Sequence, residues 1–278
     1  MSVISILKRY GIRPSKAFSQ NFLVALPTIQ KLVGEMELGS DDVVLEIGAG
    51  LGVMTRLIAE EVKFVYAVEP DEKMVEVLNS ELDELENVRI LKEDILRLRL
   101  SRILPKDEKC VVVGNIPYHI TSPILFYIRR NRDFFKKGMF VVQKEVARRL
   151  AAKPGSKDYG IVSVLMQSIA DVSQRFFISR DSFYPRPDVD SEAIRMVFDP
   201  PPSFGITNDE IFVDIVRGAF GQRRKKIINA ILGSRLIKAE REEIQGALSK
   251  AGLTGNERAE ELDIFAFARL ARAFEELS

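Results

Sequence analysis

The tetrad Asn115-Ile116-Pro117-Tyr118 has the residue types and spacing to hold a flat, amine-bearing base for alkylation. The lone pair of an adenine N6 amine is delocalised into the ring, so two acceptors on its hydrogens would shift that nitrogen toward a nucleophilic, tetrahedral form. We expect these acceptors to be the side-chain oxygen of Asn115 and the carbonyl of Ile116 or Pro117. Tyr118 offers a stacking face worth about 1 to 3 kcal/mol. The alternative is a strand-ending turn that merely contains Asn and Pro.

The segment before the tetrad reads as a buried parallel strand, and open α/β sheets bind ligands at the carboxyl ends of their strands. Strand patterns alternate with helical ones, which predicts a parallel α/β domain whose last two strands form an antiparallel edge hairpin. The expected strands are 43–47, 64–68, 88–92, 111–114, 139–142, 172–178 and 193–198. The expected helices of this domain are 53–62, 72–82, 123–131 and 144–152.

A second, helical domain is expected after the run Asp199-Pro200-Pro201-Pro202, which reads as a linker because proline cannot continue a strand. Helical periodicity without a strand signal follows at 209–220, 224–232, 239–251 and 263–277. We therefore predict a catalytic domain over residues 1–199 and a small all-α domain over residues 200–278.

Composition excludes several classes of protein. The 278 residues are 46% hydrophobic and 29% charged, and no apolar run is long enough to span a membrane. The first ten residues lack the pattern of an export signal, and the single cysteine, Cys110, excludes an internal disulfide. With His119 as the single histidine, no His/Cys cluster for zinc is available. We expect a cytoplasmic, monomeric protein that uses no metal and no membrane.

The net charge is only +1, but the charges are unevenly distributed. Lys and Arg are concentrated in residues 129–157, whereas acids are concentrated in residues 81–86. A local basic field can steer a polyanion despite a neutral sum. Solvated helix faces are the alternative explanation for this basic segment.

A glycine loop with Gly48, Gly50 and Gly52 follows the first strand and opens a helix, which indicates a nucleotide-type cofactor. A dinucleotide fingerprint would have its third glycine at Val53, so a nicotinamide cofactor is disfavoured. Glu69 ends the second strand where a carboxylate can accept from both ribose hydroxyls, and it would repel a phosphate there. Asp94 is placed to accept from an adenine amine, although either acid could instead cap its strand end.

These acceptors, with no Lys or Arg in the glycine loop, suit a cationic cofactor that lacks phosphates, and S-adenosylmethionine fits that description. The set of motifs resembles the small-subunit ribosomal RNA adenine N6,N6-dimethyltransferases, and the resemblance extends almost from end to end. Its remaining motifs are Gln20-Asn21-Phe22-Leu23, the segment 154–160, Phe183-Tyr184-Pro185-Arg186-Pro187 and the segment 219–226.

The resemblance implies a class I methyltransferase fold, Rossmann-like, with a mostly parallel seven-stranded sheet. It implies that residues 1–25 close over the cofactor and that residues 200–278 bind RNA. The cofactor-binding residues would be Gln20, Asn21, Leu23, Gly48, Gly50, Glu69, Pro70, Asp94, Ile95 and Asn115. The target base would be bound by Asn115 and Tyr118, with Phe183 as its second aromatic face.

The implied reaction is dimethylation of N6 of two adjacent adenosines near the 3′ end of small-subunit ribosomal RNA, with the small subunit as partner. Three positions depart from the family pattern: Ser19 replaces Gly, His119 replaces Asn and Asp188 replaces a basic residue. A core position for Phe183 and a helix-capping turn at Gln20-Asn21 are the structural alternatives.

Three other functions stay open at this point. The chain could methylate adenine in large-subunit RNA or DNA, it could bind RNA as an assembly factor without turnover, or it could methylate protein glutamine. The intact glycine loop and tetrad disfavour the second, and the Gln20–Leu23 element together with the basic run 223–226 disfavours the third.

Overall fold

The computed structural model describes residues 3–12, 21–104 and 108–276, and the chain divides into two compact units. The first unit comprises residues 1–147 and 172–200, and the second comprises residues 148–171 and 201–278. The predicted domain boundary at 199–200 lies at one point of this division, whereas residues 148–171 fall with the helical unit.

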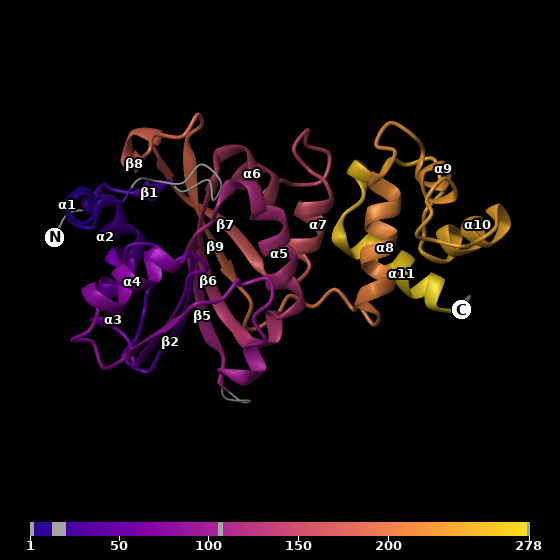
Figure 1. The fold of residues 1–278 in the computed structure, drawn as a ribbon. Helices are drawn as coiled ribbons and strands as arrows, with labels where there is room; N and C mark the ends of the chain where they lie inside the picture. The colour runs from indigo at the N-terminus through magenta and orange to yellow at the C-terminus, as the bar shows by residue number, and fades with distance from the viewer. Residues whose placement is uncertain (1–2, 13–20, 105–107, 277–278) are drawn as a thin grey trace. The chain divides into compact units, whose positions relative to one another are not determined.

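A seven-stranded sheet forms the centre of the first unit, in the order β4-β3-β2-β5-β6-β9-β7 (Figure 1). Its strands are β2 (Val43–Ile47), β3 (Phe64–Val68), β4 (Val88–Leu91), β5 (Cys110–Asn115), β6 (Phe135–Gln143), β7 (Asp171–Ile178) and β9 (Ser191–Val197). The pairs formed by β2 to β6 are parallel, and β9 runs antiparallel to β6. The predicted class, a mostly parallel sheet with an antiparallel strand pair at one side, is confirmed.

The helices of this unit are α1 (Val3–Arg9), α2 (Leu26–Gly34), α3 (Val53–Ala59), α4 (Glu72–Glu81), α5 (Thr121–Arg130) and α6 (Lys144–Leu150), the last of which ends in the second unit. Buried residues of α1, α2, α3 and α4 form one core cluster with alternate residues of the strands, such as Val111 and Val113 of β5. Val112 between them is also fully buried. Because both faces of β5 are buried, its sequence is a continuous apolar run.

A two-stranded antiparallel sheet was not predicted. Strand β1 (Phe22–Leu23) pairs with β8 (Phe183–Tyr184), so that Phe22 lies opposite Tyr184 and Leu23 opposite Phe183. The carbonyl of Ser182 accepts hydrogen bonds from the backbone N–H groups of the next two residues after β1, at 2.8 and 3.3 Å. This small sheet joins the beginning of the chain to the Phe-Tyr-Pro segment more than 150 residues later.

The second unit is helical, with α7 (Ile161–Gln167), α8 (Asp209–Phe220), α9 (Ile227–Leu232), α10 (Arg241–Lys250) and α11 (Ile264–Glu275). Asn208 and Asp263 cap α8 and α11, since each side chain accepts from a backbone N–H of the first turn. The Phe220 ring packs against Tyr159 and Phe267, with ring centroids 6.1 and 5.9 Å away. The helices predicted after residue 208 are present, but α9 begins three residues later than expected, and α7 was missed.

None of the described helices has both the length and the apolar composition needed to cross a membrane.

Candidate active site

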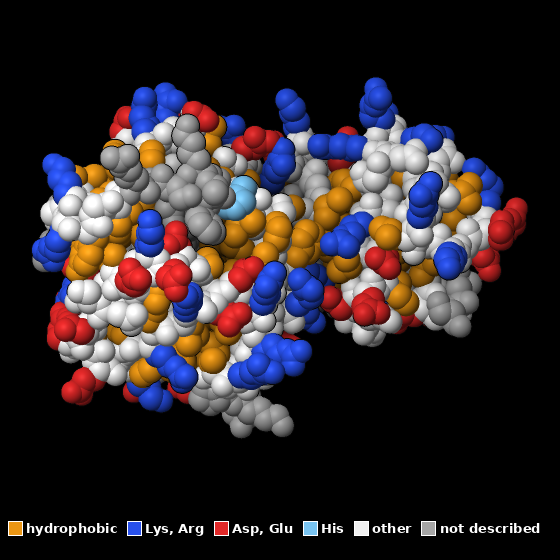
Figure 2. Space-filling model, in the orientation of Figure 1, with side chains coloured by type: hydrophobic (Ala, Val, Ile, Leu, Met, Phe, Trp, Pro, Cys, Tyr) orange, Lys and Arg blue, Asp and Glu red, His pale blue; other side chains and the backbone are white. Residues whose placement is uncertain are grey.

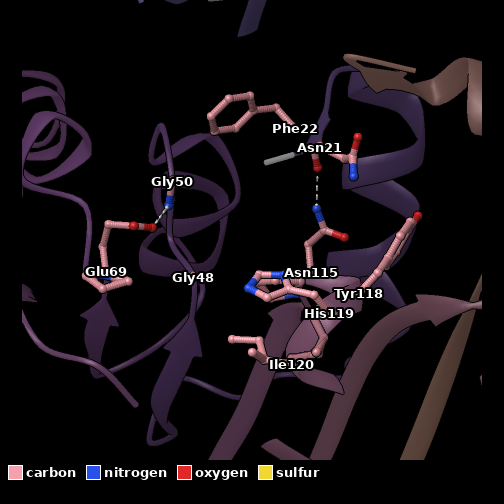
Figure 3. Close-up of a pocket in the computed structure, with 12 residues that line it drawn as sticks. Asn21, Phe22, Gly48, Gly50, Glu69, Asn115, Tyr118, His119 and Ile120 are labelled. Atoms are coloured by element: carbon pink, nitrogen blue, oxygen red, sulfur yellow. Dashed lines mark hydrogen bonds between the residues drawn. The ribbon is translucent and has the colours of Figure 1, made fainter. Parts of the chain in front are cut away.

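A cavity of about 120 Å³ lies at the carboxyl ends of β2, β3 and β5, where the sequence places its motifs (Figure 3). Its lining includes Asn21, Phe22, Gly48, Gly50, Glu69, Pro70, Asn115, Tyr118 and His119. These residues lie together because the parallel strands end at the same level: Ile47 of β2 lies beside both Val68 of β3 and Gly114 of β5. The described lining contains no Lys or Arg.

The glycine loop is held in a backbone conformation that requires glycine. Gly48 and Gly50 have φ values of +74° and +56°, in the left-handed region. A Cβ atom on Gly50 would lie 3.3 Å from a ring carbon of Phe22, so a side chain there would also crowd the cavity wall. The N–H of Gly48 donates to the carbonyl of Val68 at 2.9 Å, which ties the loop to the end of β3.

Glu69 is the buried carboxylate of this cavity, with 6% of its surface exposed. Its Oε2 accepts the N–H of Gly50 at 2.9 Å (Figure 3). Its Oε1 accepts the N–H of Asp71 at 3.0 Å. Burial raises the pKa of Glu69 above its usual range, against the effect of these two bonds. Each oxygen keeps a second lone pair, so the carboxylate can still accept from a ligand's hydroxyl groups.

The amide of Asn115 is oriented by a hydrogen bond. Its Nδ2 donates to the backbone carbonyl of Asn21 at 2.9 Å, and Figure 3 shows its oxygen pointing to the side on which Tyr118 lies. A carbonyl can only accept, so the amide nitrogen must face Asn21 and the oxygen must face away from it. The side chain therefore presents an acceptor at the cavity.

The two backbone carbonyls of the tetrad that were predicted to accept from the base differ in whether they already accept a hydrogen bond. The Pro117 carbonyl already accepts from the N–H of Ile120 and from the hydroxyl of Thr121, both at 3.2 Å. No hydrogen bond to the Ile116 carbonyl occurs within residues 3–12, 21–104 and 108–276. Of the two carbonyls, that of Ile116 is thus the one free to accept from a ligand.

Tyr118 is a half-buried ring whose hydroxyl bonds the Ser191 hydroxyl of β9 at 2.6 Å. Burial raises the pKa of this phenol, so the hydroxyl is neutral at physiological pH. The bond fixes the ring at the cavity wall. His119, the single histidine, lines the same cavity and is exposed at the surface seen in Figure 2.

Glu46 is a site residue that the sequence interpretation missed. It lies in β2, is 1% exposed, and lines a smaller cavity of about 60 Å³ together with Gly48, Gly50 and Asn115. Its Oε2 has no hydrogen-bond partner within the described part of the chain. Burial, and secondarily the negative charge of Glu69, raises the pKa of Glu46 to about 8. A carboxyl inside the strand Val43–Ile47 was the available signal, since every other residue of that strand is apolar.

Among the predicted site residues that the structure describes, four are not in the lining of the larger cavity: Leu23, Asp94, Ile95 and Phe183. Asp94 lies at the same end of the sheet, but its Oδ1 accepts the N–H of Leu96 at 3.0 Å, within its own turn. Ile95 is 5% exposed, and Phe183 is 3% exposed and belongs to the core cluster that contains Leu23. Gln20 lies outside the described residues. Leu23 lines the smaller cavity.

No group of three or more His, Cys, Asp or Glu side chains suited to a metal ion occurs in residues 3–12, 21–104 and 108–276.

Comparisons with known proteins agree with this architecture. The sequence model described as ribosomal RNA adenine dimethylase matches residues 12–276. The ribosomal RNA small subunit methyltransferase A of Syntrophus aciditrophicus is 38% identical over 273 residues, which cover 98% of each chain. The protein of the same name from Desulfotalea psychrophila is 35% identical and covers 97% of this chain and 94% of its own.

Two crystal structures are also similar. A dimethyladenosine transferase from Plasmodium falciparum has a TM-score of 0.78 at 23% identity, covers 92% of this chain and 98% of its own, and shows the same fold. The 23S rRNA methyltransferase ErmE has a TM-score of 0.67 at 26% identity and covers 92% of this chain and all of its own, 100%.

Proposed function

Because this chain belongs to the ribosomal RNA adenine dimethylase family, we propose that it dimethylates N6 of two adjacent adenosines in the 3′-terminal hairpin loop of small-subunit ribosomal RNA. The enzyme acts with S-adenosylmethionine, in the cytoplasm and as a monomer, during small-subunit biogenesis. The relatives that cover nearly the whole chain are named small subunit methyltransferases, which supports this substrate.

The orientation of the Asn115 amide is the observation that carries the proposal. An N6 amine must be met by acceptors, and the bond to the Asn21 carbonyl leaves the amide oxygen to do so. The Ile116 carbonyl is the second acceptor, since the Pro117 carbonyl is already engaged. The Tyr118 ring, fixed through Ser191, is the face on which the base stacks.

The chemistry of the lining supports the cofactor. When bound, S-adenosylmethionine supplies a methyl group activated by the positive charge of its sulfonium. Glu69 would hold the ribose, and the backbone of Gly48 and Gly50 allows close approach. The absence of Lys and Arg from the described lining of both cavities suits a cofactor that lacks phosphates, and the unpartnered oxygen of Glu46 is a buried polar atom that such a ligand could contact. Asp94 is kept as the proposed acceptor from the cofactor adenine.

Catalysis by this site rests on positioning and on acceptors that strengthen their bonds as N6 becomes positive. Asn115 and the Ile116 carbonyl hold the nitrogen in line, and no strong base is required. The second methylation has one N6 hydrogen fewer to hold, so one acceptor must tolerate a methyl group. Phe183 could meet the second face of the base only if its ring left the core cluster.

The helical unit is proposed to bind RNA, with the predicted boundary at residue 200. Arg224 and Lys225, between α8 and α9, are exposed cations of the basic run on which this proposal rests.

The test is methyl transfer from radiolabelled S-adenosylmethionine to separated ribosomal subunits from cells that lack the modification. We expect label in small-subunit RNA and primer-extension stops at two adjacent adenosines. Label confined to the large subunit would favour the second candidate, an adenine methylase of large-subunit RNA, which the similarity to ErmE supports. Binding of RNA without cofactor binding in calorimetry would instead indicate an assembly factor without turnover.

A further inference from the structure

An exposed aromatic side chain lies on the edge strand of the large sheet. Phe177 is near the end of β7, and 53% of its surface is exposed, more than for any other large hydrophobic side chain in the described residues. The ammonium of Lys144, at the start of α6, lies 5.0 Å from the centroid of its ring. The ring does not belong to the core cluster, which contains its neighbour Ile178 and against which its other neighbour, Phe176, packs.

A series of contacts connects Phe177 to the wall of the active site. Tyr118 bonds Ser191, the first residue of β9, at 2.6 Å. The preceding carbonyl, that of Asp190, accepts the N–H of Lys144 at 3.0 Å, and Lys144 covers Phe177. In the order β5-β6-β9-β7, three strand spacings separate β5 from β7, or about 14 Å. A single RNA strand covers that distance in a few nucleotides, since stacked nucleotides rise about 3.4 Å each.

The charges around Phe177 suit a phosphate backbone. Within the described chain, Lys144 forms no ion pair with a carboxylate, and the guanidinium of Arg180 bonds only the neutral carbonyl of Asp188, at 3.0 Å. Of the neighbouring acids, Asp181 is paired with Arg186 at 2.6 Å. Lys144 thus lies over the exposed ring, and Arg180 follows the ring by three residues in the chain, with the Asp190 carboxylate accepting only the Arg180 backbone N–H among the described residues. An exposed aromatic ring beside cations is the combination by which proteins bind unpaired nucleotides.

We propose that Phe177 stacks an unpaired base of the substrate RNA, a few nucleotides from the target adenosine, while Lys144 and Arg180 contact its phosphates. The inference rests on the proposed function, because it places the substrate strand along the rim from Tyr118 to β7. Phe177 would set the register of the RNA and thus select which adenosine reaches Asn115. It touches neither the cofactor nor the reacting atoms, so it is a positioning residue.

The kinetic test compares Phe177→Ala with Phe177→Trp and with a control, Phe64→Ala. Phe64 is half-buried in the first unit at the start of β3, the opposite end of the sheet from the cavity, so its loss shortens an aromatic side chain away from the proposed RNA path. Phe177→Ala should raise KM for small-subunit particles about tenfold, within the range for loss of one stacked base. The values of kcat and of KM for the cofactor should not change. Phe177→Trp should retain the low KM.

A direct test uses fluorescence, because the chain contains no tryptophan. Phe177→Trp places the only indole of the protein at the proposed stacking site. A short RNA hairpin with two adjacent adenosines in its loop should quench the emission of this indole. Phe64→Trp, at the other end of the sheet, should show no quenching. Adding Lys144→Gln to Phe177→Trp should weaken the hairpin's binding and reduce the salt dependence of its affinity.

The proposal is overturned if Phe177→Ala has the KM of the wild type, if Phe64→Ala raises KM equally, or if the hairpin leaves the indole emission of the Phe177→Trp variant unchanged. Wild-type transfer to small-subunit RNA is measured in parallel. If the wild type fails to transfer methyl groups, the proposed function itself is refuted. If the wild type transfers normally and the Phe177 variants behave as it does, only the stacking role of Phe177 is refuted.

Discussion

The two sides of the active-site cleft are built differently. The donor side, which we propose holds the methyl donor, contains Glu46, Gly48, Gly50 and Glu69 and is fixed by the ends of β2 and β3 and by backbone hydrogen bonds. The base side, which we propose holds the adenine, is the tetrad, whose Asn115 and Tyr118 side chains are held by hydrogen bonds to Asn21 and Ser191. Phe183, proposed as the second face for the base, lies in the core instead. The difference indicates that the donor pocket is preformed by the sheet, whereas the base pocket is completed by loops.

The largest expected effect is on the base side. Asn115→Ala removes the acceptor that the Asn21 carbonyl orients, and we expect kcat to fall by about 10²- to 10³-fold, as when one preorganised transition-state partner is deleted. Cofactor affinity in calorimetry should change little. If Asn115→Ala turned over at the wild-type rate, Asn115 would have no part in the mechanism. If this variant no longer bound the cofactor, Asn115 would belong to the donor side as well as to the base side.

The second prediction concerns the donor side and pH. Burial raises the pKa of Glu46 to about 8, so the folded state keeps a proton that the unfolded state begins to release near pH 4.5. The unfolding free energy of the wild type should therefore fall, relative to Glu46→Gln, as pH rises from 4.5 to 8. The difference should grow by at most about 1.4 kcal/mol per pH unit.

Urea denaturation of both proteins at pH 5, 6 and 7, without cofactor, measures this difference. Glu76→Gln controls for the loss of one negative charge, because Glu76 is exposed on α4. A constant difference between wild type and Glu46→Gln across this range would show that Glu46 ionises normally.

A smaller effect is expected from Glu69→Gln. The amide can still accept one backbone N–H but loses the charge that strengthens bonds to hydroxyl groups, so the cofactor Kd should rise about tenfold to a hundredfold. At saturating cofactor, kcat should be nearly that of the wild type. A fall in kcat without a change in Kd would place Glu69 on the base side instead.

The smallest effect is predicted for Tyr118→Phe. The stacking ring remains, but the bond to Ser191 is lost, which should raise KM for RNA by about two- to tenfold. Ser191→Ala should have a similar effect, and the double variant should be no worse than either one. Additive losses would mean that the two hydroxyl groups act separately.

The donor side was predictable because it depends on local signals. Buried runs ended by Gly, Glu or Asn place those residues at one rim of a parallel sheet, and Gly48, Glu69 and Asn115 do meet there. The role of Glu46 was missed because a carboxyl inside a strand pattern gives no sign of whether it is paired. The Asp94 carboxylate accepts a hydrogen bond from Leu96 in its own turn. Its position near the end of a strand does not show in advance whether it bonds there or faces a ligand.

The base side was less predictable because it depends on contacts between distant residues. The burial of Phe183 follows from the pairing of β1 with β8, and two-residue strands are too short to show a periodicity of two. The helix α7 was missed for a related reason: its sequence Ile161-Val162-Ser163-Val164-Leu165-Met166-Gln167 is apolar almost throughout and lacks an amphipathic pattern.

The β1–β8 pair has a thermodynamic consequence. Phe22 lines the cavity beside Gly50, and its neighbour Leu23 lies opposite Phe183, so one short ladder connects the proposed donor side to the segment proposed to face the base. If either ligand displaced this ladder, it would change the surface offered to the other. By thermodynamic reciprocity, if bound RNA changes the affinity for the cofactor by some factor, bound cofactor must change the affinity for RNA by the same factor.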